Sequence, residues 1–154
     1  MAELVFEADV AVAAETVFDA LVDLRGYGRW LPSSSAYAGT TEVSTDPVAA
    51  GTTYVERSPS GTRHGTVTEL DRPSRVTFHQ PMTMRPRLLG VIDIHVTYTL
   101  TPTPTGVHVT RLVRLTVPWL LRPAQPLVLR QFDSESRRTM DALAAFTDSR
   151  PAAP

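Results

Sequence analysis

Arg111 is the residue of this 154-residue chain whose setting most clearly indicates chemistry. In the segment 107–117, alternation by two puts Arg111 on one strand face with five apolar residues. These are Val107, Val109, Val113, Leu115 and Val117. If Pro104 and Thr105 are the two central turn residues, Tyr98 on the preceding strand faces Arg111. A tyrosine hydroxyl beside a guanidinium in an apolar cavity can orient a carbonyl, a phenolate or a carboxylate of a ligand.

Two alternatives for Arg111 stay open at this point. The side chain could lie at the rim of a cavity, paired with a carboxylate, in a purely structural role. A glycine bulge at Gly106 would shift the register by one residue and separate Arg111 from Tyr98. Either arrangement would remove the pair from a ligand site.

Glu56 and His64 form the second group that could do chemistry. Glu56 shares the face of a predicted strand with Tyr54, and His64 lies on the next strand, across a turn at Ser60-Gly61. A carboxylate and an imidazole at this distance could abstract a proton from a ligand. The alternative is a solvated glutamate on the sheet surface. Together with Arg111 and Tyr98, these two residues complete the set of candidate catalytic residues.

The four histidines give no recognisable metal site. They are His64, His79, His95 and His108, each on a different predicted strand. Asp93 and His95 share a strand face, but that face is opposite the apolar one. The chain contains no cysteine, and no glycine-rich phosphate-binding motif is present. We therefore expect no metal and no cofactor.

Composition excludes several classes of partner. The formal net charge is −1, from 15 basic and 16 acidic residues, so neither nucleic acid nor an anionic membrane is expected as a partner. The N-terminal residues lack a signal-peptide pattern, and no apolar run is long enough to span a membrane. The expectation is a cytoplasmic protein without membrane insertion, either a monomer or a homodimer.

Period-two and helical patterns predict the elements that position these residues. Seven strands are expected at 4–10, 36–44, 52–58, 63–71, 76–82, 91–102 and 107–117, and helices at 14–24 and 126–147. Residues 82–90 are expected to form an irregular loop. Short connections favour antiparallel neighbours. An isolated final helix buries its apolar side most simply when the sheet curls around it, which leaves a cavity between the two.

The resulting prediction is an α+β fold, a seven-stranded antiparallel sheet curled around a long C-terminal helix, with short helices near the N-terminus. Residues 1–148 are expected to form one domain, and 149–154 a disordered tail. On the last helix, Phe132 and Leu143 are expected on the buried side and Arg138 on the exposed side.

This order of elements resembles the helix-grip superfamily, also called SRPBCC or START-like, and in particular its polyketide cyclase/dehydrase and lipid transport branch. Three stretches carry the resemblance: 13–23, 27–32 with its tryptophan, and 65–78. Proteins of this superfamily bind lipids, hormones, aromatic polyketides or quinones. The resemblance therefore implies a cavity for a hydrophobic ligand and leaves catalysis open.

Two functions from different classes follow. The first is binding of a small hydrophobic partner that is aromatic, polyketide-like or lipid-like. The alternative is a polyketide aromatase/cyclase, in which Arg111 or Tyr98 polarises a carbonyl while His64 or Glu56 moves a proton. A protein-interaction role, as in chaperone-associated relatives, is a weaker third option. The expected ligand contacts are Tyr54, Phe78, Val96, Tyr98, Arg111, Val113, Phe132, Ser136 and Met140.

Overall fold

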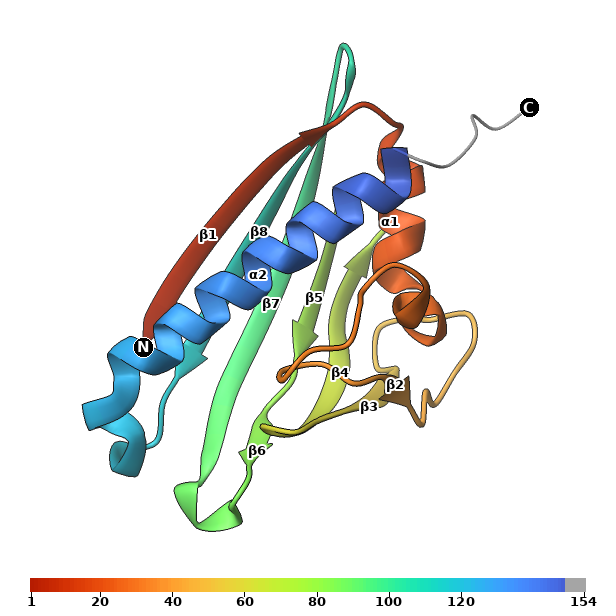
Figure 1. Cartoon of the computed structure of the whole chain (residues 1–154). Coiled ribbons are helices and arrows are strands. Elements are labelled where there is room, and N and C mark those ends of the chain that lie inside the picture. Colours follow the sequence, from red (N-terminus) through yellow and green to blue (C-terminus); the bar gives the residue numbers. More distant parts are fainter. Residues whose placement is uncertain (149–154) are drawn as a thin grey trace.

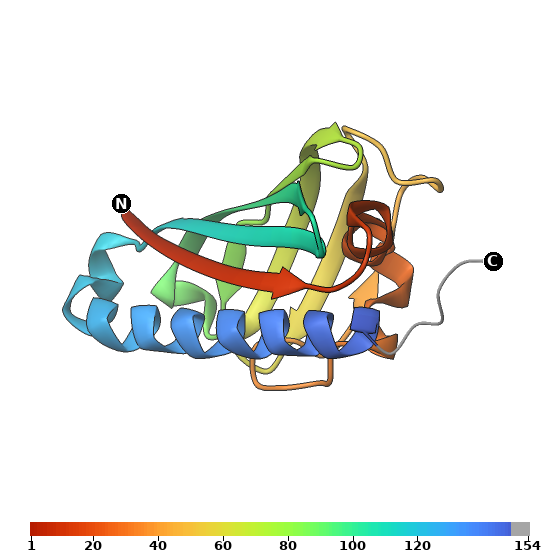
Figure 2. The same ribbon diagram turned by 90° about the horizontal axis from the view of Figure 1, so that it is seen from above.

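A curved antiparallel sheet wraps around one long helix in the computed structural model, which describes residues 1–148 (Figures 1 and 2). The long helix α2 (Gln125–Asp148) runs across one face of the sheet, and the short helix α1 (Ala14–Val22) lies at the end of the molecule where α2 finishes. The predicted α+β helix-grip fold is confirmed. The tail expected at 149–154 lies outside the described residues.

The sheet contains one strand more than the sequence pattern predicts. Its strands are β1 (Ala2–Val10), β2 (Thr40–Thr41), β3 (Thr53–Ser58), β4 (Gly61–Asp71), β5 (Arg75–His79), β6 (Met82–Met84), β7 (Val91–Thr103) and β8 (Gly106–Thr116). Their order is β1-β8-β7-β5-β4-β3-β2, and the short β6 pairs with β4 and β7. All pairs are antiparallel.

Two segments differ from the prediction for local reasons. Residues 82–90, expected to be a loop, contain β6 and the short 3-10 helix η2 (Arg87–Leu89). The strand expected at 36–44 is reduced to β2. The Ser34 hydroxyl accepts hydrogen bonds from the backbone N–H groups of Ala36 (3.1 Å) and Tyr37 (3.2 Å), and such local bonds compete with a strand ladder.

The helices begin and end close to the predicted positions. The helix expected at 14–24 stops at Val22, and a 3-10 helix η1 (Leu24–Arg29) follows, because the Asp23 carboxylate accepts a hydrogen bond from Gly26 N at 3.2 Å. The 3-10 helix η3 (Trp119–Ala124) leads into α2. Among the described helices, none is both long enough and apolar enough to cross a membrane.

The hairpin of β7 and β8 has the register that the sequence predicts. Thr103 pairs with Gly106, and the ladder continues without a shift to Tyr98 opposite Arg111. The alternative of a bulge at Gly106 is therefore wrong. Both Tyr98 and Arg111 lie on the face of the sheet that α2 covers, since Arg111 is bonded to Ser136 of that helix.

Candidate functional site

A cavity of about 70 Å³ lies between the sheet and α2. Side chains from η1, from the loop that follows it, from β3, β4, β5, β7 and β8, and from α2 form its wall. The wall residues are Leu24, Tyr27, Leu31, Ala36, Tyr37, Tyr54, Glu56, Arg63, Phe78, Gln80, Ile94, Val96, Tyr98, Arg111, Phe132, Glu135, Ser136, Arg138 and Thr139. Apolar and aromatic groups surround a small set of polar ones, as in small-molecule sites.

Arg111 is held in this cavity by two hydroxyl groups. Its Nη1 donates a hydrogen bond to the Tyr98 hydroxyl, and its Nε donates to Ser136 Oγ at 3.2 Å. Ser136 is fully buried on α2, at the point where a polar residue interrupts the apolar side of the helix. Within residues 1–148 no carboxylate forms an ion pair with Arg111. The structure therefore contradicts the alternative in which Arg111 pairs with a carboxylate at the rim of a cavity.

Glu56 is the buried carboxylate of the cavity. Its side chain is 9% exposed, and its Oε2 lies 3.7 Å from Nη1 of Arg63, which in turn donates to the Ala36 carbonyl at 2.7 Å. Burial raises the pKa of Glu56, while the positive charges of Arg63 and Arg111 partly offset that rise. A carboxyl with a raised pKa is suited to giving and taking protons near neutral pH.

The proposed Glu56–His64 pair is wrong. In the register of β3 and β4, Glu56 pairs with Arg63 and Val55 pairs with His64. His64 therefore lies on the outer face of the sheet, where it is exposed, while Glu56 points into the cavity. Successive residues of a strand point to opposite faces, so His64 and its neighbour Arg63, which is opposite Glu56, lie on different sides of the sheet.

Three aromatic rings form a continuous part of the wall. Tyr54 and Phe78 meet edge to face with ring centroids 6.1 Å apart, and Phe78 and Tyr98 do so at 6.3 Å. The Tyr54 hydroxyl donates to Gln80 Oε1 at 2.8 Å. Burial raises the pKa of Tyr54 well above its ordinary value, so its hydroxyl stays a donor. Gly65 leaves room for the Tyr54 ring, because a Cβ at this position would lie 2.1 Å from it.

Most of the predicted ligand-contacting residues lie on the wall. The structure places there Tyr54, Phe78, Val96, Tyr98, Arg111, Phe132 and Ser136. Val113 and Met140 lie instead in the tightly packed core, with no more than 6% of either residue exposed, and neither borders the cavity. The part that these nine residues play in binding remains a prediction.

Sequence reasoning missed Arg63, Gln80 and Tyr27 as wall residues. A signal existed for Arg63, since alternation along 61–67 puts it on the same face as the buried Val67. Tyr27 lies in a 3-10 helix, and Gln80 lies just beyond β5, so neither follows a periodic pattern.

A second and more apolar cavity of about 220 Å³ adjoins the first. Four residues border both cavities: Ala36, Arg63, Phe132 and Glu135. The remaining wall of the second cavity consists mainly of Met82, Met84, Ile92, Leu127 and Val128. Because it borders both spaces, the Phe132 ring forms part of the partition between a polar inner chamber and an apolar outer one.

The loop 32–37 is tied to α2 over the inner chamber. Arg138 donates to the Pro32 carbonyl at 2.6 Å and to Glu135 Oε2 at 2.9 Å, and the Ser34 hydroxyl donates to Glu135 at 3.1 Å. The Arg138 side chain is only 28% exposed, so the expectation that it is a free surface residue is wrong. Its interactions hold the cover of the cavity in place.

The fold and this interior site define a class of protein in which a curved sheet wraps around a long helix and encloses a cavity of the kind that binds small molecules. Within that class, the profile of the Polyketide cyclase / dehydrase and lipid transport family matches residues 1–146, and the chain belongs to this family. No curated protein matches the chain.

Solved structures share the fold at low sequence identity. The di-domain ARO/CYC StfQ from the steffimycin biosynthetic pathway superimposes with a TM-score of 0.73 at 16% identity, over 96% of this chain and 51% of StfQ. Protein BH1534 of Bacillus halodurans gives 0.71 at 16% identity, over 96% of this chain and 97% of its own. Mll3558 of Rhizobium loti gives 0.69 at 20% identity, over 94% and 95%. These likenesses concern the fold alone.

Proposed function

We propose that the protein binds a small hydrophobic molecule that carries one oxygen-containing polar group. The observation that supports this most is Arg111, a guanidinium set among apolar and aromatic side chains, bonded to two hydroxyls and without a carboxylate partner in residues 1–148. A cation in such surroundings is costly unless something compensates its charge. A carboxylate, phenolate or enolate of the ligand would supply that compensation.

The two adjoining cavities suit the two ends of such a ligand. Their volumes are about 70 and 220 Å³. Both are smaller than the several hundred Å³ that is typical of a ligand pocket. In the proposal, rotation of the Phe132 ring joins them. The polar group then lies beside Arg111, and the apolar body lies between the β6 region and the first turns of α2.

The experiment compares two probes of similar shape, 2-naphthoate and naphthalene, by isothermal titration calorimetry. Charge-assisted hydrogen bonds contribute about 1.5–3 kcal/mol, so Arg111→Leu should weaken 2-naphthoate binding roughly ten- to a hundredfold and leave naphthalene nearly unchanged. Arg114→Leu is the matched control, because Arg114 lies on the outer face of the same strand and pairs with Glu3 at 3.1 Å. Equal weakening of both probes by Arg111→Leu would make its role structural.

Polyketide cyclisation is the second candidate, and Glu56 is the observation that favours it. The carboxylate would take a proton from a methylene carbon between two carbonyls, and Arg111 would bind the enolate oxygen that forms. The enolate carbon then attacks a second carbonyl carbon, which forms the new C–C bond. Glu56 returns the proton to the resulting alkoxide, and loss of water gives the C=C bond. The likeness to StfQ, described as an ARO/CYC, agrees with this chemistry.

A synthetic poly-β-keto thioester tests the second candidate. The wild-type protein should convert it to a product lighter by one water, measured by mass spectrometry, and Glu56→Gln should slow this by about 10²–10⁴-fold while 2-naphthoate still binds. His64→Gln is the control and should be without effect, since His64 lies outside the cavity. Conversion at the rate of the uncatalysed reaction would leave binding as the function.

A further inference from the structure

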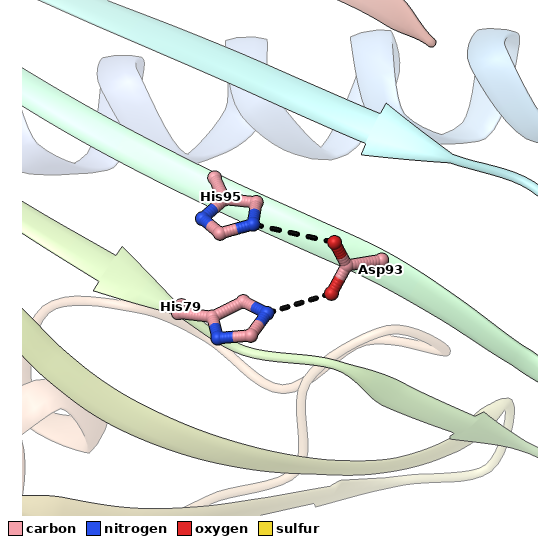
Figure 3. A group of neighbouring side chains, drawn as sticks. All are labelled: His79, Asp93 and His95. Atoms are coloured by element: carbon pink, nitrogen blue, oxygen red, sulfur yellow. Dashed lines mark hydrogen bonds and ion pairs between the residues drawn. The ribbon is translucent and has the colours of Figure 1, made fainter.

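His79, Asp93 and His95 form a compact group on the outer face of the sheet, away from the cavity (Figure 3). Nε2 of His79 lies 2.6 Å from one oxygen of Asp93, and Nε2 of His95 lies 3.3 Å from the other. The two imidazole rings are stacked with centroids 4.1 Å apart. Each of the three side chains offers one ligand atom, and these atoms all lie within 4.8 Å of one another.

We propose that this group binds one divalent transition-metal ion such as Zn²⁺, through Nε2 of both histidines and one oxygen of Asp93. Two imidazoles and a carboxylate are ligands that zinc uses in proteins, with water in the fourth position. Magnesium and calcium prefer oxygen ligands and would bind poorly. Both Nε2 atoms are directed at the Asp93 carboxylate, and the ion would lie between these three groups.

The strands supply the spacing that chelation needs. Asp93 and His95 are two residues apart on β7 and so share a face, and His79 is directly opposite His95 on β5. Donors at about 2.0–2.2 Å from a tetrahedral zinc lie roughly 3.3 Å apart, which the present separations approach within about 1.5 Å. The parallel rings must turn so that both lone pairs meet the ion. Side chains that are 36%, 47% and 44% exposed have room to do so.

The charges around the group permit a cation. Asp93 contributes a carboxylate in contact with both histidines, and its negative charge favours a cation between them. Arg114, opposite His95 on β8, is a nearby positive charge, but it forms an ion pair with Glu3 at 3.1 Å. Thr77 and Thr97, the next pair along β5 and β7, are uncharged and bond to each other at 3.1 Å. Thr66, opposite His79, and Thr116, opposite Asp93, are also uncharged.

The position of the group gives the ion a consequence for the cavity. Phe78 and Gln80 flank His79, and Ile94 lies between Asp93 and His95; all three point the other way and line the cavity wall. A metal ion would therefore link β5 to β7 on the sheet face opposite the cavity. Because an ion that binds only the folded state stabilises it, zinc should raise the melting temperature.

Zinc binding to protein first stripped with EDTA tests the inference. Titration calorimetry should give one Zn²⁺ per chain, and zinc at about ten times its dissociation constant should raise the melting temperature by about 3–6 °C. The variants His79→Gln and His95→Gln should each abolish both effects. With Cu²⁺, electron paramagnetic resonance of the wild type should show two nitrogen ligands, and one in either variant. Circular dichroism checks that the variants are folded, which their surface positions favour.

His108→Gln is the matched control. His108 also contacts two carboxylates, but Asp9 contacts its Nδ1 at 2.7 Å and Glu7 its Nε2 at 3.2 Å, so the two lie on opposite sides of the ring and cannot share one ion with it. This variant should keep the zinc effect in full. Zinc binding that survives His79→Gln, that is lost in His108→Gln, or that is absent at millimolar zinc would overturn the proposal. None of these outcomes depends on binding of a cavity ligand.

Discussion

Truncation of Phe132 tests whether its ring divides two spaces. The sequence pattern treats Phe132 and Leu143 alike, as buried residues of one helix face, and predicts about 2–5 kcal/mol for removal of either side chain. The structure separates them. Leu143 is 1% exposed within the packed core, whereas Phe132 is partly exposed and borders both cavities.

The expected costs differ for that reason. Leu143→Ala leaves a new hole in a filled region and should lower the free energy of unfolding by about 2–5 kcal/mol. A side chain that already faces empty space on two sides loses fewer contacts, so Phe132→Ala should cost about 1–2 kcal/mol, below the range usual for a core phenylalanine. Urea unfolding followed by circular dichroism measures both. Leu127→Ala, at a position 66% exposed on the same helix, is the control and should cost about 0.5 kcal/mol or less.

Phe132→Ala should also join the two cavities. Binding of 1-anilinonaphthalene-8-sulfonate, an apolar anion too large for the inner chamber alone, should therefore become tighter in the variant while the protein remains cooperative in unfolding. A cost at Phe132 equal to that at Leu143, with no change in dye affinity, would show that the ring is ordinary core packing and that the partition does not exist.

Three further predictions concern the wall. Gly65→Ala should push the Tyr54 ring aside and cost about 1–3 kcal/mol by thermal or urea unfolding, whereas Gly28→Ala, where a Cβ meets nothing within 4 Å, should be nearly neutral. Arg138→Ala should cost about 1–2 kcal/mol, because it removes hydrogen bonds that hold the cover, and should speed proteolysis of that loop. Burial raises the pKa of Glu56 above its ordinary 4.5, so protonation of this carboxyl stabilises the folded state. The free energy of unfolding of the wild type, relative to that of Glu56→Gln, should therefore increase as the pH falls from 7 toward 4. A constant difference across that range would mean that Glu56 is solvated.

The two halves of the site differ in how far the sequence could predict them. The β7–β8 hairpin has a two-residue turn next to long alternating strands, so counting back from the turn places Tyr98 opposite Arg111. The β3–β4 hairpin was predicted less well. There the central turn residues are Pro59 and Ser60, one position earlier than assumed, so Glu56 pairs with Arg63. His64 is the next residue along the strand and therefore points to the opposite face.

Contacts between distant segments could not be predicted from the sequence for a different reason. Ser136 could be found because it interrupts an apolar helix face, and a buried polar group needs a partner. The partner of Glu56, the cover formed by the loop 32–37, and the approach of His79 to Asp93 depend on how the sheet curves and on which strands become neighbours. No local pattern encodes those distances.

The charges on the cavity wall do not balance, and this imbalance gives the proposed binding its chemical preference. Arg63 faces Glu56 and Arg138 faces Glu135, so each of these cations has a carboxylate. Among residues 1–148, Arg111 donates hydrogen bonds to two hydroxyls and forms no ion pair, since the Glu56 carboxylate, whose pKa it lowers, is paired with Arg63. The wall thus carries a surplus of one positive charge, and protonation of Glu56, which burial favours, would increase that surplus. A ligand with a negative oxygen, or one whose oxygen becomes negative as it reacts, gains more from this cavity than a hydrocarbon of the same shape.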